Sequence, residues 1–402
     1  MSTDIQKQLE ILGDGIVDLI TPEEFENALR RSTKEKRPLR IKYGADPSAA
    51  DLHLGHTVVL RKLKQFQDLG HLVVFLIGDF TARIGDPSQR SETRPMLSEQ
   101  EVLRNAKTYE TQVFKILDRG KTEVRYNSEW LGKMTPADFL NLTAQYTVAR
   151  ILERDDFQKR YRGNKPIALI EFLYPLLQGY DSVVLKSDVE IGGTDQKFNL
   201  LVGRELQRVW NQTPQIVMTL PLLEGTDGTL KMSKSYNNYI AIQDFPQEMF
   251  GKVMSIPDFL IERYFRYVSG MSPKEYQLVI SELLEKNPRD AKAKLAEQIV
   301  SLYHGPKEAE DARQEFDRIF RDKGLPDEIP VVSLSRKFLD LPSLLMEAGL
   351  VTSKNEARRL IMHGGVKVDG QKVTDSAFRV ELNRSILIQC GKRKFAKVEY
   401  HV

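Results

Sequence analysis

The sequence predicts an α/β protein built on a doubly wound parallel sheet of the nucleotide-binding kind, and three consecutive segments predict it. Residues 39–44 alternate like a strand and end at a glycine, residues 55–69 have helical periodicity, and residues 72–77 form a continuous apolar run. Uninterrupted apolar runs are typical of strands buried on both faces of a parallel sheet. A strand, a helix and a second strand in this order form a right-handed crossover, as in Rossmann-like folds.

Length and composition predict a multidomain globular protein. A chain of 402 residues suggests two or three domains, and 41% hydrophobic with 29% charged residues is ordinary for this class. No apolar stretch is long enough to cross a bilayer, and the start lacks the features of a secretory signal. The single cysteine, Cys390, excludes an internal disulfide and fits a reducing compartment. We therefore expect a cytoplasmic protein without a membrane segment.

The elements of residues 1–245 fit one catalytic domain. Residues 1–35 are expected to be helical, with Thr21 as an N-cap before Pro22 at the first helical position. Further strands are predicted at residues 123–127, 188–191 and 215–219. Residues 130–185 are mostly helical and interrupt the sheet pattern, so we expect an insertion there that is a candidate dimer interface.

Three further regions follow the catalytic domain. Residues 246–325 have helical periodicity throughout, and prolines mark the helix boundaries. Residues 326–338 are expected to be a linker. Residues 339–402 are predicted to form a small α+β domain. Its helix opens with a capping box at Ser353–Glu356, and a strand, an Asp-Gly turn and a second strand span residues 366–373.

The C-terminal region is basic while the rest of the chain is mildly acidic. Residues 335–402 hold 13 Lys and Arg against 7 Asp and Glu, a local charge of +6. The whole chain carries +3, so the preceding 334 residues sum to −3. Lys354, Arg358 and Arg359 lie close to one helix face, and Lys367 follows in the hairpin. This pattern suits the phosphates of structured RNA, although an ordinary solvated helix would also explain it.

Two short motifs, 174 residues apart, carry the chemistry. The first, His53-Leu54-Gly55-His56, places two imidazoles at a helix start, where a glycine lets phosphate approach the backbone amides. The second, Lys231-Met232-Ser233-Lys234-Ser235, places two ammonium groups on a loop rich in turn residues. Both sets suit negative charge that develops on phosphate, as when ATP activates a carboxylate. Taken singly, the histidines could be capping or core residues, and the lysines could belong to an exposed loop.

Residues 44–48, Gly-Ala-Asp-Pro-Ser, precede the first motif, and with both motifs the chain resembles the class I aminoacyl-tRNA synthetases. The resemblance implies that ATP is a substrate, with Mg²⁺ arriving as its counterion. No Cys/His spacing typical of a zinc site is present. By resemblance, the catalytic side chains are His53, His56, Lys231 and Lys234. The implied ATP contacts, with Asp195 on the ribose hydroxyls, are Ser48, Gly55, Gly193, Asp195, Met232, Ser233 and Lys234.

Within this class the chain resembles the tyrosyl-tRNA synthetases. Tyr43 and Asp181 match the family pair that binds the substrate phenol, and Gln196 matches the residue that faces the reacting carboxylate. Tyr174 and Gln178, with Asp86, match the residues that hold the α-amino group. Tyr174, Gln178 and Asp181 are four and three residues apart, which places them on one helix face. Phenylalanine would leave buried polar groups without a partner, and tyrosyl enzymes are themselves the standard example of this kind of discrimination.

A pair of arginines can be added to the resemblance, and two features depart from it. Arg90 and Arg94 follow Asp86 in a polar loop; they either add positive charge near the departing pyrophosphate or are solvated loop arginines. The chain departs from many tyrosyl enzymes in having Lys197-Phe198 after the Asp-Gln pair and Glu190 in place of a glutamine.

The C-terminal region, residues 339–402, resembles an RNA-binding domain named after a small-subunit ribosomal protein. The resemblance implies a homodimeric tyrosine–tRNA ligase whose partners are tyrosine, ATP and tRNA(Tyr), with Lys354, Arg358, Arg359 and Lys367 contacting the tRNA. It assigns residues 246–325 to the anticodon side. Three alternatives stay open: a tryptophanyl enzyme, an adenylyl transferase that does not use tRNA, and an RNA-binding protein that has lost catalysis.

Overall fold

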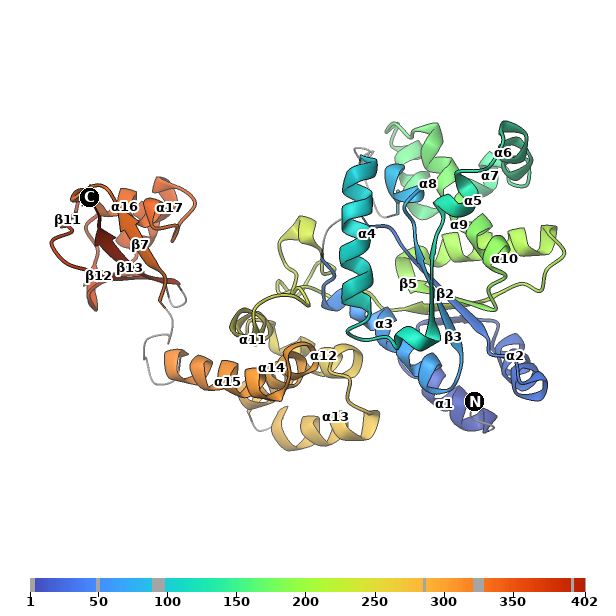
Figure 1. The fold of residues 1–402 in the computed structure, drawn as a ribbon, viewed down its shortest axis with the longest axis horizontal. Coiled ribbons are helices and arrows are strands. Elements are labelled where there is room, and N and C mark those ends of the chain that lie inside the picture. Colours follow the sequence, from blue (N-terminus) through green and yellow to red (C-terminus); the bar gives the residue numbers. More distant parts are fainter. Residues whose placement is uncertain are drawn as a thin grey trace. The chain divides into compact units, whose positions relative to one another are not determined.

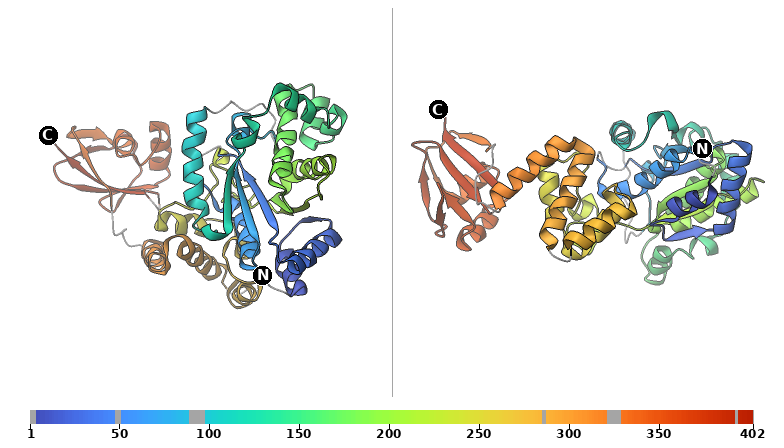
Figure 2. Two further views of the ribbon diagram at one scale, coloured as in Figure 1. Left: turned by 45° about the vertical axis from the view of Figure 1, so that its right-hand side comes forward. Right: turned by 90° about the horizontal axis from the view of Figure 1, so that it is seen from below.

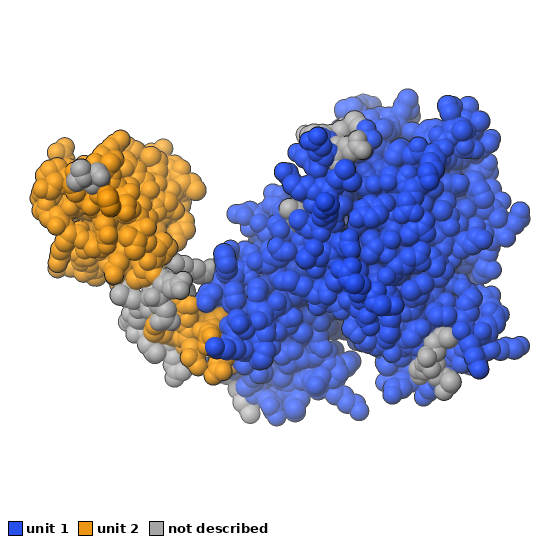
Figure 3. Space-filling view, in the orientation of Figure 1, with its two compact units in different colours: residues 1–309 blue, residues 310–402 orange. Residues whose placement is uncertain are grey.

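The computed structural model describes residues 4–47, 51–88, 98–284, 287–320, 329–391 and 394–401. The chain divides into two compact units, residues 1–309 and residues 310–402 (Figure 3). Each unit is described by itself below.

The first unit is built on a six-stranded sheet with the strand order β1-β6-β5-β2-β3-β4 (Figure 1). All neighbouring strands are parallel except β1, which runs antiparallel to β6 at the edge. Five of the six strands are those predicted from the sequence; β1 lies in a region expected to be helical. The strands are β1 (Asp18–Ile20), β2 (Arg40–Ala45), β3 (Leu72–Ile77), β4 (Thr122–Tyr126), β5 (Val189–Gly193) and β6 (Ile216–Leu220).

Helices cover both faces of this sheet (Figure 2). The predicted cap at Thr21 is confirmed, because its side chain accepts from the Glu24 backbone N–H and Pro22 begins the helix. The predicted helix after the first motif is also confirmed, with His53 as its N-cap. The helices that flank the strands are α1 (Ile5–Gly13), α2 (Pro22–Glu35), α3 (Leu54–Asp68), α4 (Glu99–Val113), α9 (Leu169–Leu185) and α10 (Lys197–Val209).

The insertion at residues 130–185 and the region after residue 246 are helical, as predicted. Pro273 and Pro288 each begin a helix, as the sequence indicated. The insertion holds α5 (Ser128–Leu131), α6 (Pro136–Thr143), α7 (Val148–Ile151), α8 (Asp155–Arg162) and α9. The later region holds α11 (Pro246–Met254), α12 (Ile261–Val268), α13 (Pro273–Val279), a π-helical turn (Ile280–Leu284), α14 (Pro288–His304) and α15 (Pro306–Phe320), which crosses into the second unit.

The second unit contains a five-stranded sheet with the order β10-β9-β12-β13-β7 and a two-stranded sheet of β8 and β11. Its helices and sheets enclose a separate apolar core that includes Leu341, Leu344 and Ile388. The elements are β7 (Val331–Leu334), β8 (Phe338–Asp340), α16 (Leu341–Glu347), α17 (Lys354–Met362), β9 (Val366–Val368), β10 (Gln371–Val373), β11 (Arg379–Glu381), β12 (Ile386–Cys390) and β13 (Lys394–Tyr400).

The predicted hairpin turn of this unit is confirmed, but its sheet begins before the predicted domain boundary. Asp369 and Gly370 both have positive φ, as a two-residue hairpin turn requires. Residues 326–338 were expected to be a linker, but β7 and the start of β8 lie within them. Because β7 pairs in parallel with β13, the domain's sheet begins at Val331.

Among the described residues, no helix is long and apolar enough to cross a membrane.

Candidate active site

A cavity of about 600 Å³ opens at the carboxyl ends of the parallel strands. Strands β2 and β5 are neighbours, but β2 leads to β3 on one side while β5 leads to β6 on the other. The crevice outside such a reversal is the usual ligand site of open α/β sheets. The lining includes most of the residues singled out in the sequence: Tyr43, His53, Gly55, His56, Asp86, Tyr174, Gln178, Asp181, Gly193, Asp195, Gln196, Lys231, Met232 and Ser233.

Among the described residues predicted for catalysis, Lys234 is outside the lining of this cavity. Lys234 lies next to it in the loop, between the lining residues Ser233 and Ser235. Ser48, Arg90 and Arg94 lie outside the residues that the structure describes.

The two imidazoles of the first motif stack at the start of α3, with ring centroids 3.9 Å apart. The backbone N–H of His53 donates to His56 Nδ1 at 3.1 Å, which leaves His56 Nε2 to carry the proton of the neutral ring. Burial, with the nearby charges of Lys234 and Lys231, lowers the pKa of His56 to about 4. Burial likewise lowers the pKa of His53. Near neutral pH both rings are therefore uncharged hydrogen-bond donors.

The second motif covers the start of α3. The Gly55 backbone N–H donates to the sulfur of Met232 at 3.3 Å. A side chain at position 55 would approach the His53 ring to 3.0 Å, so the close packing here requires glycine. A phosphate can reach this amide only if Met232 moves away.

Each lysine of the second motif is paired with a carboxylate. Lys231 Nζ lies 3.0 Å from Asp195 Oδ2, and Lys234 Nζ lies 2.9 Å from Asp51 Oδ2. Asp195 belongs to the short 3₁₀ turn after β5, which the family resemblance assigns to the ribose. Asp51 had no part in the sequence-based prediction, because its role depends on a pairing 183 residues away.

The opposite end of the cavity is acidic. Tyr174 donates its phenolic O–H to Asp46 Oδ2 at 2.9 Å, and Thr81 donates to Asp46 Oδ1 at 2.8 Å. Gln196 Nε2 donates to Asp86 Oδ2 at 2.7 Å. Burial, with the nearby carboxylates of Asp86 and Asp181, raises the pKa of Asp46 to about 7. Clustered carboxylates of this kind suit an ammonium group.

An amide network holds two of the lining glutamines. Asn199 Nδ2 donates to Gln178 Oε1 at 3.0 Å and to Gln196 Oε1 at 3.1 Å. Arg154 of the insertion donates to Asn199 Oδ1 at 3.3 Å. Sequence reasoning missed Asn199, since its position one turn after Gln196 is visible only once α10 is known to begin there.

Asp181 lies at the base of the cavity and is buried. Trp130 Nε1 donates to its Oδ1 at 2.8 Å, and Asn127 Nδ2 to its Oδ2 at 3.3 Å. Burial raises the pKa of Asp181 to about 7, against the opposing charge of Lys42. A buried carboxylate between two N–H donors can accept one more hydrogen bond from a hydroxyl group.

The structure separates Tyr43 from the helix that carries Asp181. Successive side chains of a strand point to opposite faces, and Lys42 contacts α9 through Gln178 and Ser182. Tyr43 therefore leaves β2 on the other face, where its ring packs against Phe75 with centroids 5.9 Å apart. No hydrogen bond joins Tyr43 to Asp181 in the described part of the chain. The expectation that Tyr43 and Asp181 bind one substrate hydroxyl stays a prediction, and Lys42 is the β2 residue whose side chain contacts the helix that carries Asp181.

The described residues contain no cluster of three or more His, Cys, Asp or Glu placed to hold a metal ion. The predicted RNA-contacting residues Lys354, Arg358, Arg359 and Lys367 are all exposed, the first three on α17 and the last on β9.

Comparison with known proteins agrees with this geometry. The family described as tRNA synthetases class I (W and Y) matches residues 33–321, and the S4 domain matches residues 341–386. A tyrosine–tRNA ligase of Thermotoga maritima is 54% identical over 98% of this chain and 97% of its own. A tyrosine–tRNA ligase of Carboxydothermus hydrogenoformans is 52% identical, covering 98% of both chains.

Solved structures show the same fold. A C-terminally truncated mitochondrial tyrosyl-tRNA synthetase of Aspergillus nidulans superposes with a TM-score of 0.65 at 24% identity, over 79% of this chain and 95% of that one. The tyrosyl-tRNA synthetase of Archaeoglobus fulgidus, solved with L-tyrosine, gives 0.62 at 22% identity, over 77% of this chain and all of that one. Near-full-length identity above 50%, together with this fold, shows that the chain belongs to the tyrosine–tRNA ligases of the class I aminoacyl-tRNA synthetases.

Proposed function

We propose that the cavity binds tyrosine and ATP together, forms tyrosyl-adenylate and pyrophosphate, and then transfers the tyrosyl group to the 3′ end of tRNA(Tyr). One observation carries this proposal: a single cavity is lined by the carboxyl groups of Asp46, Asp86 and Asp181, here called its acidic end, and by the nitrogen donors of His53, His56 and Lys231, here called its basic end. The acidic end complements the amino acid's ammonium and phenol, and the basic end complements a triphosphate. Because this reaction serves translation, we expect the protein to act in the cytoplasm.

The first step needs positioning and charge stabilisation. A carboxylate oxygen of tyrosine bonds to the α-phosphorus, the bond from that phosphorus to the bridging oxygen breaks, and pyrophosphate leaves with the electron pair. His56 Nε2–H donates to a non-bridging α-phosphate oxygen as negative charge gathers there. Lys231 and Lys234 exchange Asp195 and Asp51 for the β- and γ-phosphates, with Mg²⁺ brought by ATP. No protein nucleophile takes part.

In the second step a ribose hydroxyl oxygen of the tRNA bonds to the adenylate carbonyl carbon and the bond from that carbon to the phosphate oxygen breaks. AMP leaves with the electron pair, and the hydroxyl proton passes to AMP or solvent. Asp195 is freed from Lys231 when that lysine turns to phosphate, so its carboxylate becomes available to the ribose hydroxyls of ATP. At the amino-acid end, Tyr174, Gln178 and Asp86 bind the ammonium, Gln196 faces the carboxylate, and Asp181 accepts from the phenol. The exposed basic residues of α17 and β9 bind tRNA phosphates.

We also propose that the insertion forms a homodimer interface. Leu169, Leu140 and Val148, which lie in three of its helices, are 81%, 68% and 59% exposed. Exposed apolar side chains gathered on one inserted region are typical of a protein interface. The partner that fits is a second copy of the chain.

Replacing Leu169 by glutamate should shift the protein from dimer to monomer, because a charge would have to be buried at the interface. Sedimentation equilibrium at micromolar concentrations measures the mass. Leu278→Glu on α13 is the matched control, since Leu278 is 57% exposed outside the insertion. A wild-type mass equal to one chain would contradict the proposal.

Replacing Lys234 by alanine should lower the rate of adenylate formation by about 10²–10³-fold while tyrosine affinity changes less than about twofold, since the ammonium acts on charge developing in the transition state. Tyrosine-dependent pyrophosphate exchange and equilibrium binding measure the two effects. Lys252→Ala is the control, because Lys252 and Lys234 lie 5.3 and 5.8 Å from the same Tyr239 ring. Equal losses of rate and affinity would refute a transition-state role.

Removing the C-terminal domain should spare pyrophosphate exchange and abolish tRNA charging, because the cavity lies in the first unit and the domain has its own core. A chain ending at residue 328 removes β7 together with the rest of its sheet. Exchange and charging are measured on the same preparation. Charging at the wild-type rate would show that the domain does not hold the tRNA.

Tyrosine binding should release protons near neutral pH. Burial raises the pKa values of Asp46 and Asp181 to about 7, so both are partly protonated near neutral pH. The tyrosine ammonium, bound at Tyr174 next to Asp46, and the phenol O–H donated to Asp181 both favour the ionised carboxylates. Affinity should therefore rise as pH increases through about 7. Calorimetry in two buffers of different ionisation enthalpy counts the protons, and Asp46→Asn should reduce the release. Proton uptake, or affinity that does not depend on pH across this range, would contradict the assignment.

A further inference from the structure

A buried ion pair lies at the strand reversal beneath the cavity. Lys42 of β2 and Glu190 of β5 are register partners on adjacent parallel strands, so their side chains leave the same face of the sheet. Lys42 Nζ lies 2.9 Å from Glu190 Oε1, and the two side chains are 0% and 1% exposed. Lys42 also lines the cavity. Through Lys42 the pair is therefore connected to the cavity lining.

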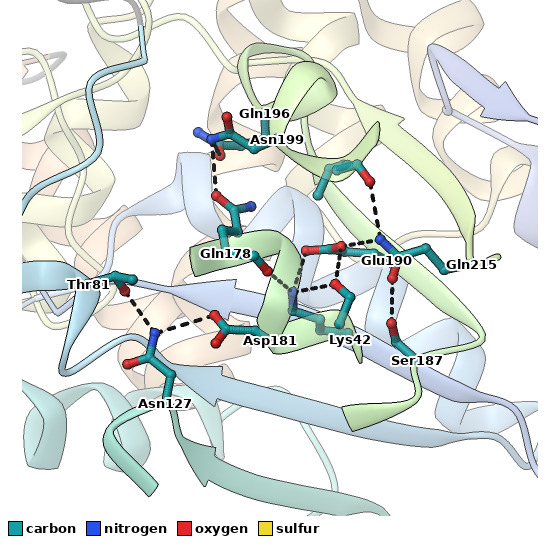
Figure 4. Close-up of polar contacts among 12 residues, drawn as sticks. Lys42, Thr81, Asn127, Gln178, Asp181, Ser187, Glu190, Gln196, Asn199 and Gln215 are labelled. Carbon is teal, nitrogen blue, oxygen red and sulfur yellow. Dashed lines mark hydrogen bonds and ion pairs between the residues drawn. The ribbon is translucent and has the colours of Figure 1, made fainter. Parts of the chain in front are cut away.

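Hydrogen-bond acceptors surround the ammonium group of Lys42. Besides Glu190 it donates to the Gln178 carbonyl at 3.0 Å and to Ser182 Oγ at 2.7 Å, so each of its three N–H groups has an acceptor (Figure 4). Two of these acceptors belong to α9. The lysine therefore ties the centre of the sheet to the helix that carries Tyr174, Gln178 and Asp181.

Glu190 is held just as completely. Its Oε2 accepts from Ser182 Oγ at 2.8 Å and from the side-chain amide of Gln215. Gln215 in turn donates to the Leu200 carbonyl at 3.2 Å and accepts from Ser187. Figure 4 shows this chain of contacts running from Gln178 through Lys42 and Glu190 to Gln215. A glutamate at this position matches the buried positive charge of Lys42.

Helix α9 contains a proline close to the residues that Lys42 contacts. Pro175 lies inside it and has no N–H, so the helix lacks the bond that residue 175 would make to the carbonyl of residue 171, one turn before Gln178. The bond from Lys42 reaches the backbone at Gln178, between Tyr174 and Asp181. A small shift of this turn would move both ends of the amino-acid pocket relative to each other.

Stability alone does not account for a buried ion pair. The desolvation of two charges offsets much of their attraction, and replacing both partners by uncharged residues is often neutral for stability. Removing only one partner is costly because the other charge stays buried and unpaired. A role in the site and a role in folding therefore predict different behaviour for single and double replacements.

We propose that Lys42 and Glu190 are positioning residues that fix the pocket face of α9, so that Gln178 and Asp181 keep the spacing needed to hold the two ends of tyrosine. This inference rests on the proposed tyrosine site.

The test compares Lys42→Met, Glu190→Gln and the double variant by pyrophosphate exchange, with thermal unfolding measured on each. Lys42→Met should raise the KM for tyrosine by about tenfold or more, leave the KM for ATP within about twofold, and reduce the preference for tyrosine over phenylalanine. The double variant should regain most of the unfolding temperature but keep the raised tyrosine KM. Glu190→Gln, which preserves shape, should give a smaller rise.

Lys62→Met is the matched control. Lys62 is also a buried lysine with three acceptors, the carbonyls of Ile11, Leu12 and Asp14, and it lies outside the cavity lining. It should lower the unfolding temperature without changing the tyrosine KM. The proposal is overturned if the folded double variant has the wild-type KM for tyrosine, or if the ATP KM rises equally. Failure of the wild-type protein to exchange pyrophosphate with tyrosine would instead refute the proposed function.

Discussion

The reversal of strand order between β2 and β5 is the constraint on which the rest of the structure depends. The reversal creates a crevice at the carboxyl ends of the parallel strands, and residues from distant parts of the chain meet there. His53 follows β2 along the chain, Asp195 follows β5, and α9 enters from the insertion. Because each is fixed by regular secondary structure, their mutual geometry is set before any ligand arrives, which is what charge-stabilising catalysis requires.

The charged side chains at both ends of the cavity have partners within the protein. The lysines of the loop rest on Asp195 and Asp51, and Asp46 is bonded by Tyr174 and Thr81. Substrate binding then replaces existing pairings and does not have to neutralise bare charges. Such exchange lets binding energy appear late, when the phosphates and the lysines come together.

Local patterns in the sequence predicted most of the fold. The apolar runs of the parallel strands, the Thr21-Pro22 cap and the Asp369-Gly370 turn each depend on neighbouring residues, and all are confirmed. Strand β1 escaped notice because three residues cannot establish a period, and it is defined only by pairing with β6. The prolines that precede strand β7 predict a linker there. The strand is defined by its partner β13, which lies far along the chain.

The sequence motifs predicted which residues gather in the site, but they did not predict which side chains contact one another. Both motifs and the α9 triplet converge on one cavity, as the sequence indicated. The direction of side chains on β2 was not readable, because a shift of one residue exchanges the faces of a strand. Asn127, Trp130 and Asn199 have no local signature; only the tertiary structure brings them to Asp181 and the glutamines.

A crystal structure with a non-hydrolysable analogue of tyrosyl-adenylate would show whether the two charged ends of the cavity hold the two halves of one intermediate. We predict one molecule across the cavity, with its ammonium beside Tyr174 and Asp86, its phenol on Asp181, and its phosphate at His56. An analogue bound elsewhere, or one bound here with its phosphate among the carboxylates and its phenol near the lysines, would contradict this assignment.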